Sequence, residues 1–312
     1  MSFSLDLRRR LAGRAFLVAS LLSAGIGYAF TTGFSALEVA APMQAAGAIG
    51  LCALMLFTGR SPFRRYQRPM WRLIGRLAGG NAVVAVLYPF AVRRLTLGTV
   101  AAVVVLGYLS VGFKKVWHMR TTAWGLQHMC GRLLVLGGII MLNWPLQGEI
   151  VGLLCALVSA ACVWNTITVL GKMKHHGLED QGAAIANLLS APLLFAAVFL
   201  LRGGVHWMSS DLVSWGALAG LLTLMLPVLL TNAALRRISE LDVGVMQSLS
   251  TPVHAMVALV GAALGWLASD QRLAFFPGWA AILLIAGAAV GVSSLKEPSA
   301  DVLRVGTQPS GG

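Results

Sequence analysis

Hydrophobic residues are concentrated in ten uncharged runs, and charged residues fall between them. Each run has 16 to 27 residues, and about 20 helical residues are needed to cross the hydrocarbon core of a bilayer. The runs are long and lack the alternation of polar and apolar residues that marks the strands of a membrane barrel. They therefore predict an all-α, polytopic membrane protein with ten transmembrane helices, over residues 15–37, 39–59, 77–92, 95–113, 133–148, 150–171, 181–201, 212–235, 243–269 and 273–295.

The composition supports this class, and the placement of charge gives an orientation. Of the 312 residues 57% are hydrophobic and 11% are charged, against roughly 25% charged in soluble domains. With the N-terminus in the cytoplasm, the segments on its side hold 18 of the 24 basic residues, and the opposite side holds 4. This asymmetry follows the positive-inside rule. We therefore expect an inner-membrane protein with both termini in the cytoplasm, in contact with the lipid bilayer and with no nucleic acid.

Two pairs of segments suggest an internal repeat. The first run contains LLSAGIGYAFTTG and the sixth contains LVSAACVWNTITVLG, and RRLTLG from Arg93 aligns with RRISEL from Arg236. Because five spans is an odd number, a second five-span unit enters the membrane inverted. Chance similarity between apolar segments of low complexity is the alternative. The predicted units are a first five-helix repeat over 15–143, a second over 148–295 and a disordered cytoplasmic tail over 296–312.

Inverted repeats predict a function from their geometry. Two inverted halves can open to either side in turn, with a substrate site near the middle of the membrane where they meet. This predicts a secondary transporter that works by alternating access. A membrane protein that binds a partner within the bilayer is one alternative, and an intramembrane enzyme is another. A polar cavity between the halves favours transport, whereas an interior filled by Leu and Val favours partner binding.

The second half resembles the EamA-type branch of the drug/metabolite transporter superfamily, and most of all its threonine and homoserine exporter group. Three segments carry the resemblance: GLLCALVSAACVWNTITVLGK in the sixth run, TLMLPVLLTNAALRRI with Pro227, and QSLSTPVHAMVALVGAALGW with Pro252. The resemblance implies ten helices and the export of small metabolites, either amino acids or apolar and cationic compounds. Pro227 and Pro252 are then structural residues.

The chain also departs from that group. Where those exporters have Glu-Pro in the ninth helix, this sequence reads Thr251-Pro252, and where they have a Glu and then a Pro in the fourth helix, it reads Val104 and Tyr108. Carboxylates that could meet a substrate ammonium or carry a proton are therefore missing. Proton coupling would have to use His254 or His128, whose ordinary pKa near 6.5 suits that task; otherwise the protein is a facilitator.

Polar residues inside apolar runs are costly and are therefore candidates for a substrate site. In the ninth run, Gln247, Ser250, Thr251 and His254 share one helix face, and Pro252 should kink the helix there and free a carbonyl. Packing against a neighbouring helix is the alternative role for this stripe.

Further candidates lie in four other runs. Trp164 and its neighbour Asn165 align with Tyr28 in the repeat, and an aromatic pair could cover an apolar or cationic ligand. Anchoring at the membrane interface is the alternative for Trp164. The remaining candidates are Asn81 and Tyr88 on one face of the third run, and the isolated amide Asn187 in the seventh. Arg132, near the end of the fifth run, is expected to extend toward the interface.

Catalysis has little support in the sequence. There is no zinc-binding HExxH helix, no phosphate loop and no glycine-flanked nucleophilic serine with a base, so we predict no catalytic residue, no metal and no cofactor. The four cysteines lie in or beside apolar runs without a pairing pattern. We therefore predict that the protein is not an enzyme. The sequence leaves open whether the chain forms a homo-oligomer.

Overall fold

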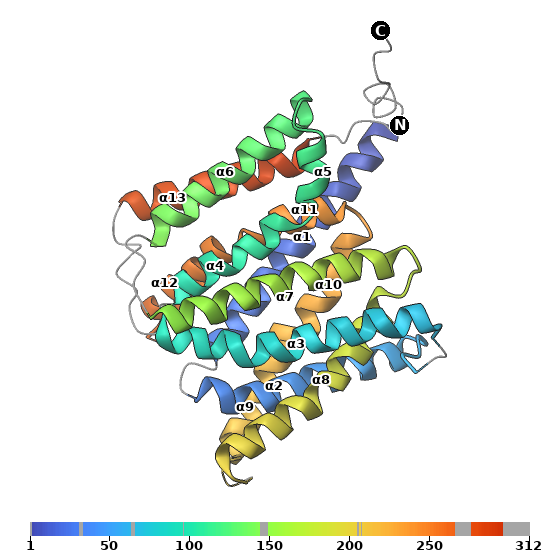
Figure 1. The fold of residues 1–312 in the computed structure, drawn as a ribbon, viewed down its shortest axis with the longest axis vertical. Coiled ribbons are helices and arrows are strands. Elements are labelled where there is room, and N and C mark those ends of the chain that lie inside the picture. The colour runs from blue at the N-terminus through green and yellow to red at the C-terminus, as the bar shows by residue number, and fades with distance from the viewer. Residues whose placement is uncertain are drawn as a thin grey trace.

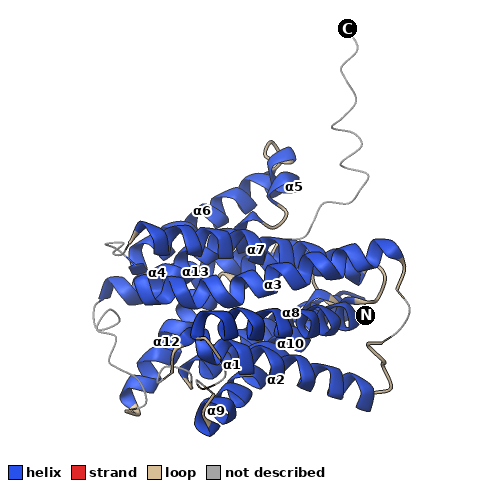
Figure 2. Cartoon of the chain, turned by 60° about the horizontal axis from the view of Figure 1, so that its bottom comes forward, coloured by secondary structure: helices blue, strands red, loops and turns tan. Residues whose placement is uncertain are grey.

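In the regular elements that the structure describes, the chain is entirely helical (Figure 2). The computed structural model describes residues 2–30, 34–63, 66–95, 97–143, 149–204, 206, 208–265 and 276–295. The predicted tail over 296–312 lies outside these ranges. The helices are α1 Ser2–Ala29, α2 Ala36–Phe57, α3 Arg68–Arg94, α4 Leu97–Ser110, α5 Phe113–His118, α6 Ala123–Asn143, α7 Ile150–Lys174, α8 Glu179–Arg202, α9 Ser210–Gly220, the π-helical turn η1 Leu221–Met225, α10 Leu226–Leu235, α11 Glu240–Gln247, α12 Ser250–Ala263 and α13 Phe276–Ser294.

Each of the ten predicted runs contains helix. The eighth run forms α9, η1 and α10, the ninth forms α11 and α12, and each of the others contains one main helix. Six stretches of the described chain are long and apolar enough to cross a membrane: Leu7–Gly27, Leu37–Phe57, Ile150–Lys174, Glu179–Arg202, Ser210–Leu235 and Glu240–Ala263. The described chain is therefore all-helical, and its composition and helix lengths are those of a membrane protein.

The first and second parts of the chain pack into one another. Helix α1 packs mainly against α10. Helix α2 packs against α8 and α9, and α3 packs against α7 and α8. Helix α4 packs against α7, and α6 lies beside α13, far from α2, α8 and α9 (Figure 1). Helices before residue 144 thus contact mainly helices after residue 148, and the core lies between these two sets.

Small residues allow two of these crossings to be close. A Cβ atom placed on Gly107 of α4 would lie 2.0 Å from the carbonyl oxygen of Ala160 in α7. A Cβ atom on Gly220 would lie 2.1 Å from the carbonyl oxygen of Met43 in α2. Apolar helices in a bilayer associate through close packing at such positions. These two glycines therefore fix how α4 lies on α7 and how α9 lies on α2.

Prolines coincide with both irregular stretches. Proline has no N–H, so Pro227 cannot bond the carbonyl of Thr223, four residues earlier, and Thr223 lies in the π-helical turn η1. Pro252 likewise leaves the carbonyl of Ser248 without its helical donor, and the ninth run is interrupted between Gln247 and Ser250. Both prolines therefore lie next to a break in regular α-helix.

Arg132 does not extend toward an interface, so that expectation is wrong. Its side chain is buried, and it donates hydrogen bonds to the carbonyls of Leu109 and Val111, the latter at 2.8 Å. These carbonyls belong to the end of α4 and the turn that follows it, where Gly112 has a φ of 67°. The last carbonyls of a helix lack partners within it. Arg132 therefore caps α4 from within the bundle.

We expect Gly107→Ala and Gly220→Ala each to lower the free energy of unfolding by about 1–3 kcal/mol, because the added methyl group meets a backbone carbonyl that cannot move alone. Gly79→Ala is the matched control. Its Cβ atom meets nothing within 4 Å, and alanine favours helix by up to about 1 kcal/mol. The measurement is unfolding in detergent micelles, and equal midpoints for the three variants would contradict the close crossings.

Candidate functional site

A cavity of about 310 Å³ lies between the two sets of helices. Its size is at the lower end of the range for small-molecule sites. The first set lines it with Ser20, Leu21 and Ala24 of α1, Met43 and Gln44 of α2, Asn81, Val84, Ala85 and Tyr88 of α3, and Val104 and Tyr108 of α4. The second set adds Val163, Thr166, Ile167 and Leu170 of α7, Asn187 of α8, Thr223 and Leu224 of η1, Pro227, Val228 and Thr231 of α10, Gln247 of α11, and Ser250 and His254 of α12.

Three side-chain amides form a network on one wall of this cavity. The Oδ1 atom of Asn187 accepts hydrogen bonds from Nδ2 of Asn81 at 2.7 Å and from Nε2 of Gln44 at 3.0 Å. Gln44 also donates to Ser190 at 2.7 Å, and Ser190 donates to the backbone carbonyl of Asn187 at 2.9 Å. The network therefore joins α2, α3 and α8 by polar contacts within an apolar interior.

One donor of this network has no partner in the described part of the chain. It is the Nδ2 group of Asn187, and this residue is 2% exposed. A buried donor without an acceptor costs about 1–3 kcal/mol. Asn187 lines the cavity, but its Nδ2 atom has almost no accessible surface, so a ligand oxygen there reaches this donor only after the side chain shifts.

A second polar group lies among α1, α10 and α11. The hydroxyls of Ser20 and Thr231 are 3.2 Å apart, and Nε2 of Gln247 donates to Thr231 at 3.3 Å. Ser20 also contacts the carbonyl of Pro227 at 3.3 Å. These hydroxyl and amide groups also line the cavity, so polar groups reach it from both sets of helices.

The cavity has amide and hydroxyl groups within a mostly apolar lining and carries no fixed charge. None of its described lining residues is Asp, Glu, Lys or Arg, and the amides and hydroxyls are interspersed with Leu, Val and Met. The part of the chain that the structure describes contains no group of His, Cys, Asp and Glu side chains able to hold a metal ion. Transfer of a carboxylate or ammonium from water into such surroundings is costly unless it is paired. The arrangement is therefore suited to binding a small, uncharged or net-neutral compound with polar and apolar parts.

Most predicted site residues lie together around this cavity: Asn81, Tyr88, Asn187, Gln247, Ser250 and His254, with the structural Pro227. Thr251 and Pro252 are buried but are not among the lining residues. Asn187, the isolated amide of the seventh run, accepts hydrogen bonds from two other amides.

Two members of the predicted aromatic group, Trp164 and Asn165, are not among the described lining residues of the cavity. Trp164 is 43% exposed, and Asn165 pairs with Arg76, whose guanidinium donates to the Asn165 Oδ1 atom at 2.7 Å. Asn165 in turn donates to the Arg76 carbonyl at 3.3 Å. The side chain of Tyr28 lies outside the described residues. Trp164 is therefore at the surface, and Asn165 joins α7 to α3 through Arg76.

Sequence reasoning missed several lining residues. Gln44 is a lone amide in an apolar run, the same signal that selected Asn187, and it could have been found by that criterion. Ser20 and Thr231 are small hydroxyl residues that also occur in ordinary helix packing, so they carried no distinctive signal. Tyr108 was noted only as a departure from the family pattern, yet it lines the cavity.

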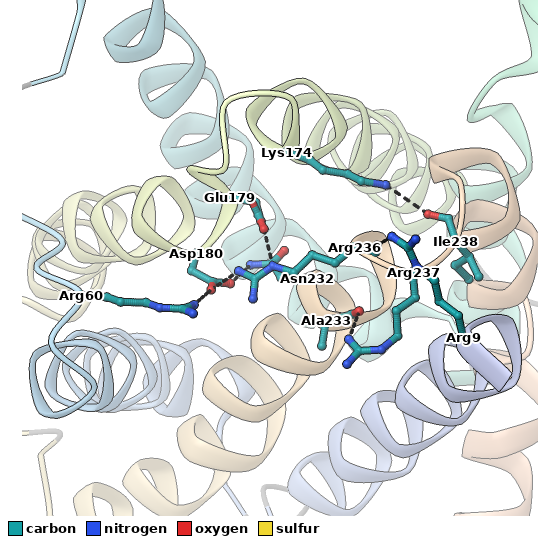
Figure 3. Close-up of polar contacts among 10 residues, drawn as sticks. All are labelled: Arg9, Arg60, Lys174, Glu179, Asp180, Asn232, Ala233, Arg236, Arg237 and Ile238. Atoms are coloured by element: carbon teal, nitrogen blue, oxygen red, sulfur yellow. Dashed lines mark hydrogen bonds and ion pairs between the residues drawn. The ribbon is translucent and has the colours of Figure 1, made fainter. Parts of the chain in front are cut away.

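Charged groups gather instead at one end of the bundle, in an ion-pair cluster of Arg60, Glu179, Asp180, Asn232 and Arg236 (Figure 3). The Arg236 guanidinium contacts Glu179 at 2.5 Å and also contacts Asp180. Asn232 donates to Asp180 at 3.0 Å, and Arg60 lies 3.5 Å from the same carboxylate. The cluster therefore joins the start of α8 to the end of α10 and to the segment after α2.

The carboxylates make this cluster sensitive to the loss of its cation. The side chains of Glu179 and Asp180 are 3% and 9% exposed, so solvent contributes little to balancing their charge. Burial opposes the charge of Arg236, but its hydrogen bonds with both carboxylates and their attraction outweigh this effect and raise its pKa above the ordinary value. Arg236 therefore stays protonated and holds both acids.

Two further ion pairs lie at the opposite end. Arg202 at the end of α8 contacts Glu38 near the start of α2 at 2.5 Å. Arg94 at the end of α3 pairs with Glu149, just before α7. In each pair the acid and the base come from different sets of helices. Both ends of the cavity-containing bundle are therefore closed by ionic contacts between the sets.

Comparison with protein-family models finds no match, and comparison with curated proteins finds none. A solved structure described only as "Crystal structure of protein" is 19% identical to this chain and matches it with a TM-score of 0.67. The match covers 92% of this chain and 96% of that one. At this level of identity the similarity shows a shared fold, extending over nearly the whole of both chains.

We expect Arg236→Gln to lower the free energy of unfolding by about 2–4 kcal/mol, because it leaves two buried carboxylates without their main cation. The expected loss is smaller than for a fully buried ion pair because the Arg236 side chain is 39% exposed to solvent. Arg60→Gln is the control and should cost less than about 1 kcal/mol, since Arg60 is 57% exposed. Unfolding midpoints in detergent distinguish the two, and equal losses would show that the carboxylates do not depend on Arg236.

Proposed function

We propose that this protein is a secondary transporter that moves a small, net-neutral metabolite across the membrane by alternating access. The observation that carries this proposal is the cavity between the two sets of helices, with amide and hydroxyl groups from both sets in its wall. A partner-binding membrane protein would be expected to fill this space with Leu and Val. Export of such a compound is the direction that the resemblance to metabolite exporters favours.

Two ion pairs between α2 and α8 support the inverted repeat. Residues 142 positions after Glu38 and Arg60 are Asp180 and Arg202, so these two residues, in and just after α2, each have a counterpart of the same charge type in α8. The contacts are exchanged: Glu38 meets Arg202, and Arg60 meets Asp180. The start of α2 therefore lies at the end of α8, so the two helices are antiparallel. Antiparallel counterparts are the geometry of repeats related by an axis in the membrane plane.

The amide network lies close to where such an axis would pass. Gln44 and Asn187 are 143 positions apart, one residue from the offset that relates the two ion pairs, and they are hydrogen-bonded to each other. In inverted-repeat transporters the substrate site lies near the middle of the bilayer at the interface between repeats. We therefore assign substrate binding to the cavity wall that contains Gln44, Asn81 and Asn187, opposite Thr231 and His254.

The membrane arrangement in this proposal is ten spans with both termini in the cytoplasm. Arg60 follows α2, Lys174 is the last residue of α7 and Arg236 follows α10, and all three lie at the same end of the bundle (Figure 3). That end also receives Arg9 from the N-terminal part of α1, which bonds the carbonyl of Arg236 at 2.7 Å. A common end for these basic residues agrees with alternating spans and with the positive-inside rule.

Cysteine labelling tests this arrangement. In a variant with the four native cysteines replaced, we expect a cysteine at Ser209 to react with a membrane-impermeant maleimide in intact cells. A cysteine at Ser61, beside the ion-pair cluster, should react only after the membrane is permeabilised. Labelling of both positions in intact cells would contradict the assignment of Ser61 and Ser209 to opposite sides.

Counterflow in proteoliposomes tests transport with labelled neutral amino acids and organic cations as the panel. We expect uptake of a net-neutral compound, and at least about a tenfold loss in Asn187→Leu and His254→Leu, because each removes a polar group that lines the cavity. Trp164→Leu is the matched control, since Trp164 is outside the lining, and it should keep the wild-type rate. A pH gradient that changes uptake in the wild type should have no effect in His254→Leu.

The variants are compared at equal abundance and with unfolding midpoints measured in parallel. Transport at the wild-type rate by both Asn187→Leu and His254→Leu would show that the cavity does not bind the transported compound. If the folded wild-type protein takes up none of the compounds in the panel, this would count against transport of these compound classes and favour the partner-binding role.

A further inference from the structure

A second cavity of about 310 Å³ lies at the end of the bundle that holds Arg236. It is enclosed by the first turns of α1, the start of α6, the end of α7 and the segment that connects α10 to α11. Its lining is mostly polar, unlike that of the central cavity. Five of its residues are cationic: Arg9, Arg10, Lys174, Arg236 and Arg237. Asp242 is the one acidic residue among its described lining.

Several of these cations are held by neutral groups. Arg9 donates to the carbonyl of Arg236 at 2.7 Å, and Lys174 donates to the carbonyl of Ile238 at 3.3 Å. Arg237 donates to the carbonyl of Ala233 at 2.7 Å, and its guanidinium lies 4.6 Å from the centre of the Phe16 ring. A carbonyl orients a cation but does not cancel its charge. The carboxylates of Glu179 and Asp180 balance the charge of Arg236, and Asp242 is one acid against the other four cations of the lining, so the cavity keeps an excess of positive charge.

Two buried side chains add polar atoms without partners. The Nε1 atom of Trp124 and the Nδ1 atom of His128 have no hydrogen-bond partner in the described part of the chain, and these residues are 8% and 1% exposed. Their rings are in contact, with centroids 4.2 Å apart, and both line the cavity. The indole N–H can only donate. The Nε1 atom has almost no accessible surface, so an acceptor in the cavity reaches this donor after a small shift of the Trp124 ring.

We propose that this cavity binds the phosphate group of an anionic ligand, supplied either by a lipid headgroup or by a soluble phosphate. A phosphate carries several acceptor oxygens in different directions, so it can accept from arginine, lysine and the indole N–H together. Basic pockets between helices on the cytoplasmic side of membrane proteins bind phosphate headgroups in this manner. The site is separate from the central cavity and does not rest on the proposed transport activity.

Two substitutions test the site with little risk to folding. Trp124→Phe keeps the ring and removes the N–H, and Arg9→Gln removes a cation whose side chain is exposed. Arg8→Gln is the matched control, because Arg8 is the adjacent exposed arginine and does not line the cavity. The full-length protein is placed in phosphatidylcholine nanodiscs for one arm, and in nanodiscs containing phosphatidylglycerol for the other.

In the first arm, inorganic phosphate is titrated and the unfolding midpoint is followed, because a ligand that binds the native state raises it. In the second arm, native mass spectrometry counts the phosphatidylglycerol that stays bound. We expect a response by the wild type and by Arg8→Gln in at least one arm, and at least about tenfold weaker binding in Arg9→Gln and Trp124→Phe. A response to phosphate alone identifies a soluble ligand, and retention of phosphatidylglycerol alone identifies a lipid headgroup. No response in either arm, or wild-type binding by Trp124→Phe, overturns the site.

Discussion

The structure depends on one constraint: a polar group buried in an apolar bundle must find its partner on another helix. Arg132 meets it by capping the carbonyls at the end of α4. Gln44 and Asn187 meet it by bonding each other across two helices. Glu179 and Asp180 meet it through Arg236. Each solution joins different segments of the chain, so pairing of buried groups adds to apolar packing in holding these helices together.

Charge and polarity are therefore separated along the bundle. Ion pairs lie at its two ends, and uncharged amides and hydroxyls lie around the central cavity. Under the proposed mechanism, ionic contacts at each end must break in turn, whereas the amide network can stay in place. Exposed ion pairs such as Arg94–Glu149 are weak enough to separate readily. The buried carboxylates of Glu179 and Asp180 make the other end harder to open, unless Arg236 moves together with them.

The helical class and the positions of the helices could be predicted from the sequence, because ten apolar runs leave little alternative to helix. The direction in which each side chain points could not. Run 150–171 is apolar on all sides, so its sequence does not determine how α7 is rotated, and Trp164 faces outward although it was expected at the site. The burial of Glu179 and Asp180 was likewise not foreseeable, since it arises only when the ends of α2, α8 and α10 meet. Lone polar residues in apolar runs were better guides, and Asn81, Asn187 and Gln247 all line the cavity.

The π-helical turn η1 lies between α9 and α10 within one predicted span. It is wider than an α-helical turn by one residue, and each helical residue adds about 100° of rotation. Helix α9 is fixed before this turn by the contact of Gly220 with α2, while Thr231 and Arg236 come after it. Deleting one residue within Leu221–Met225 would restore a regular helix and rotate both side chains by more than a quarter turn. The extra residue in η1 thus sets the rotation of α10 about its axis. That rotation places Thr231 at the cavity and Arg236 in the ion-pair cluster.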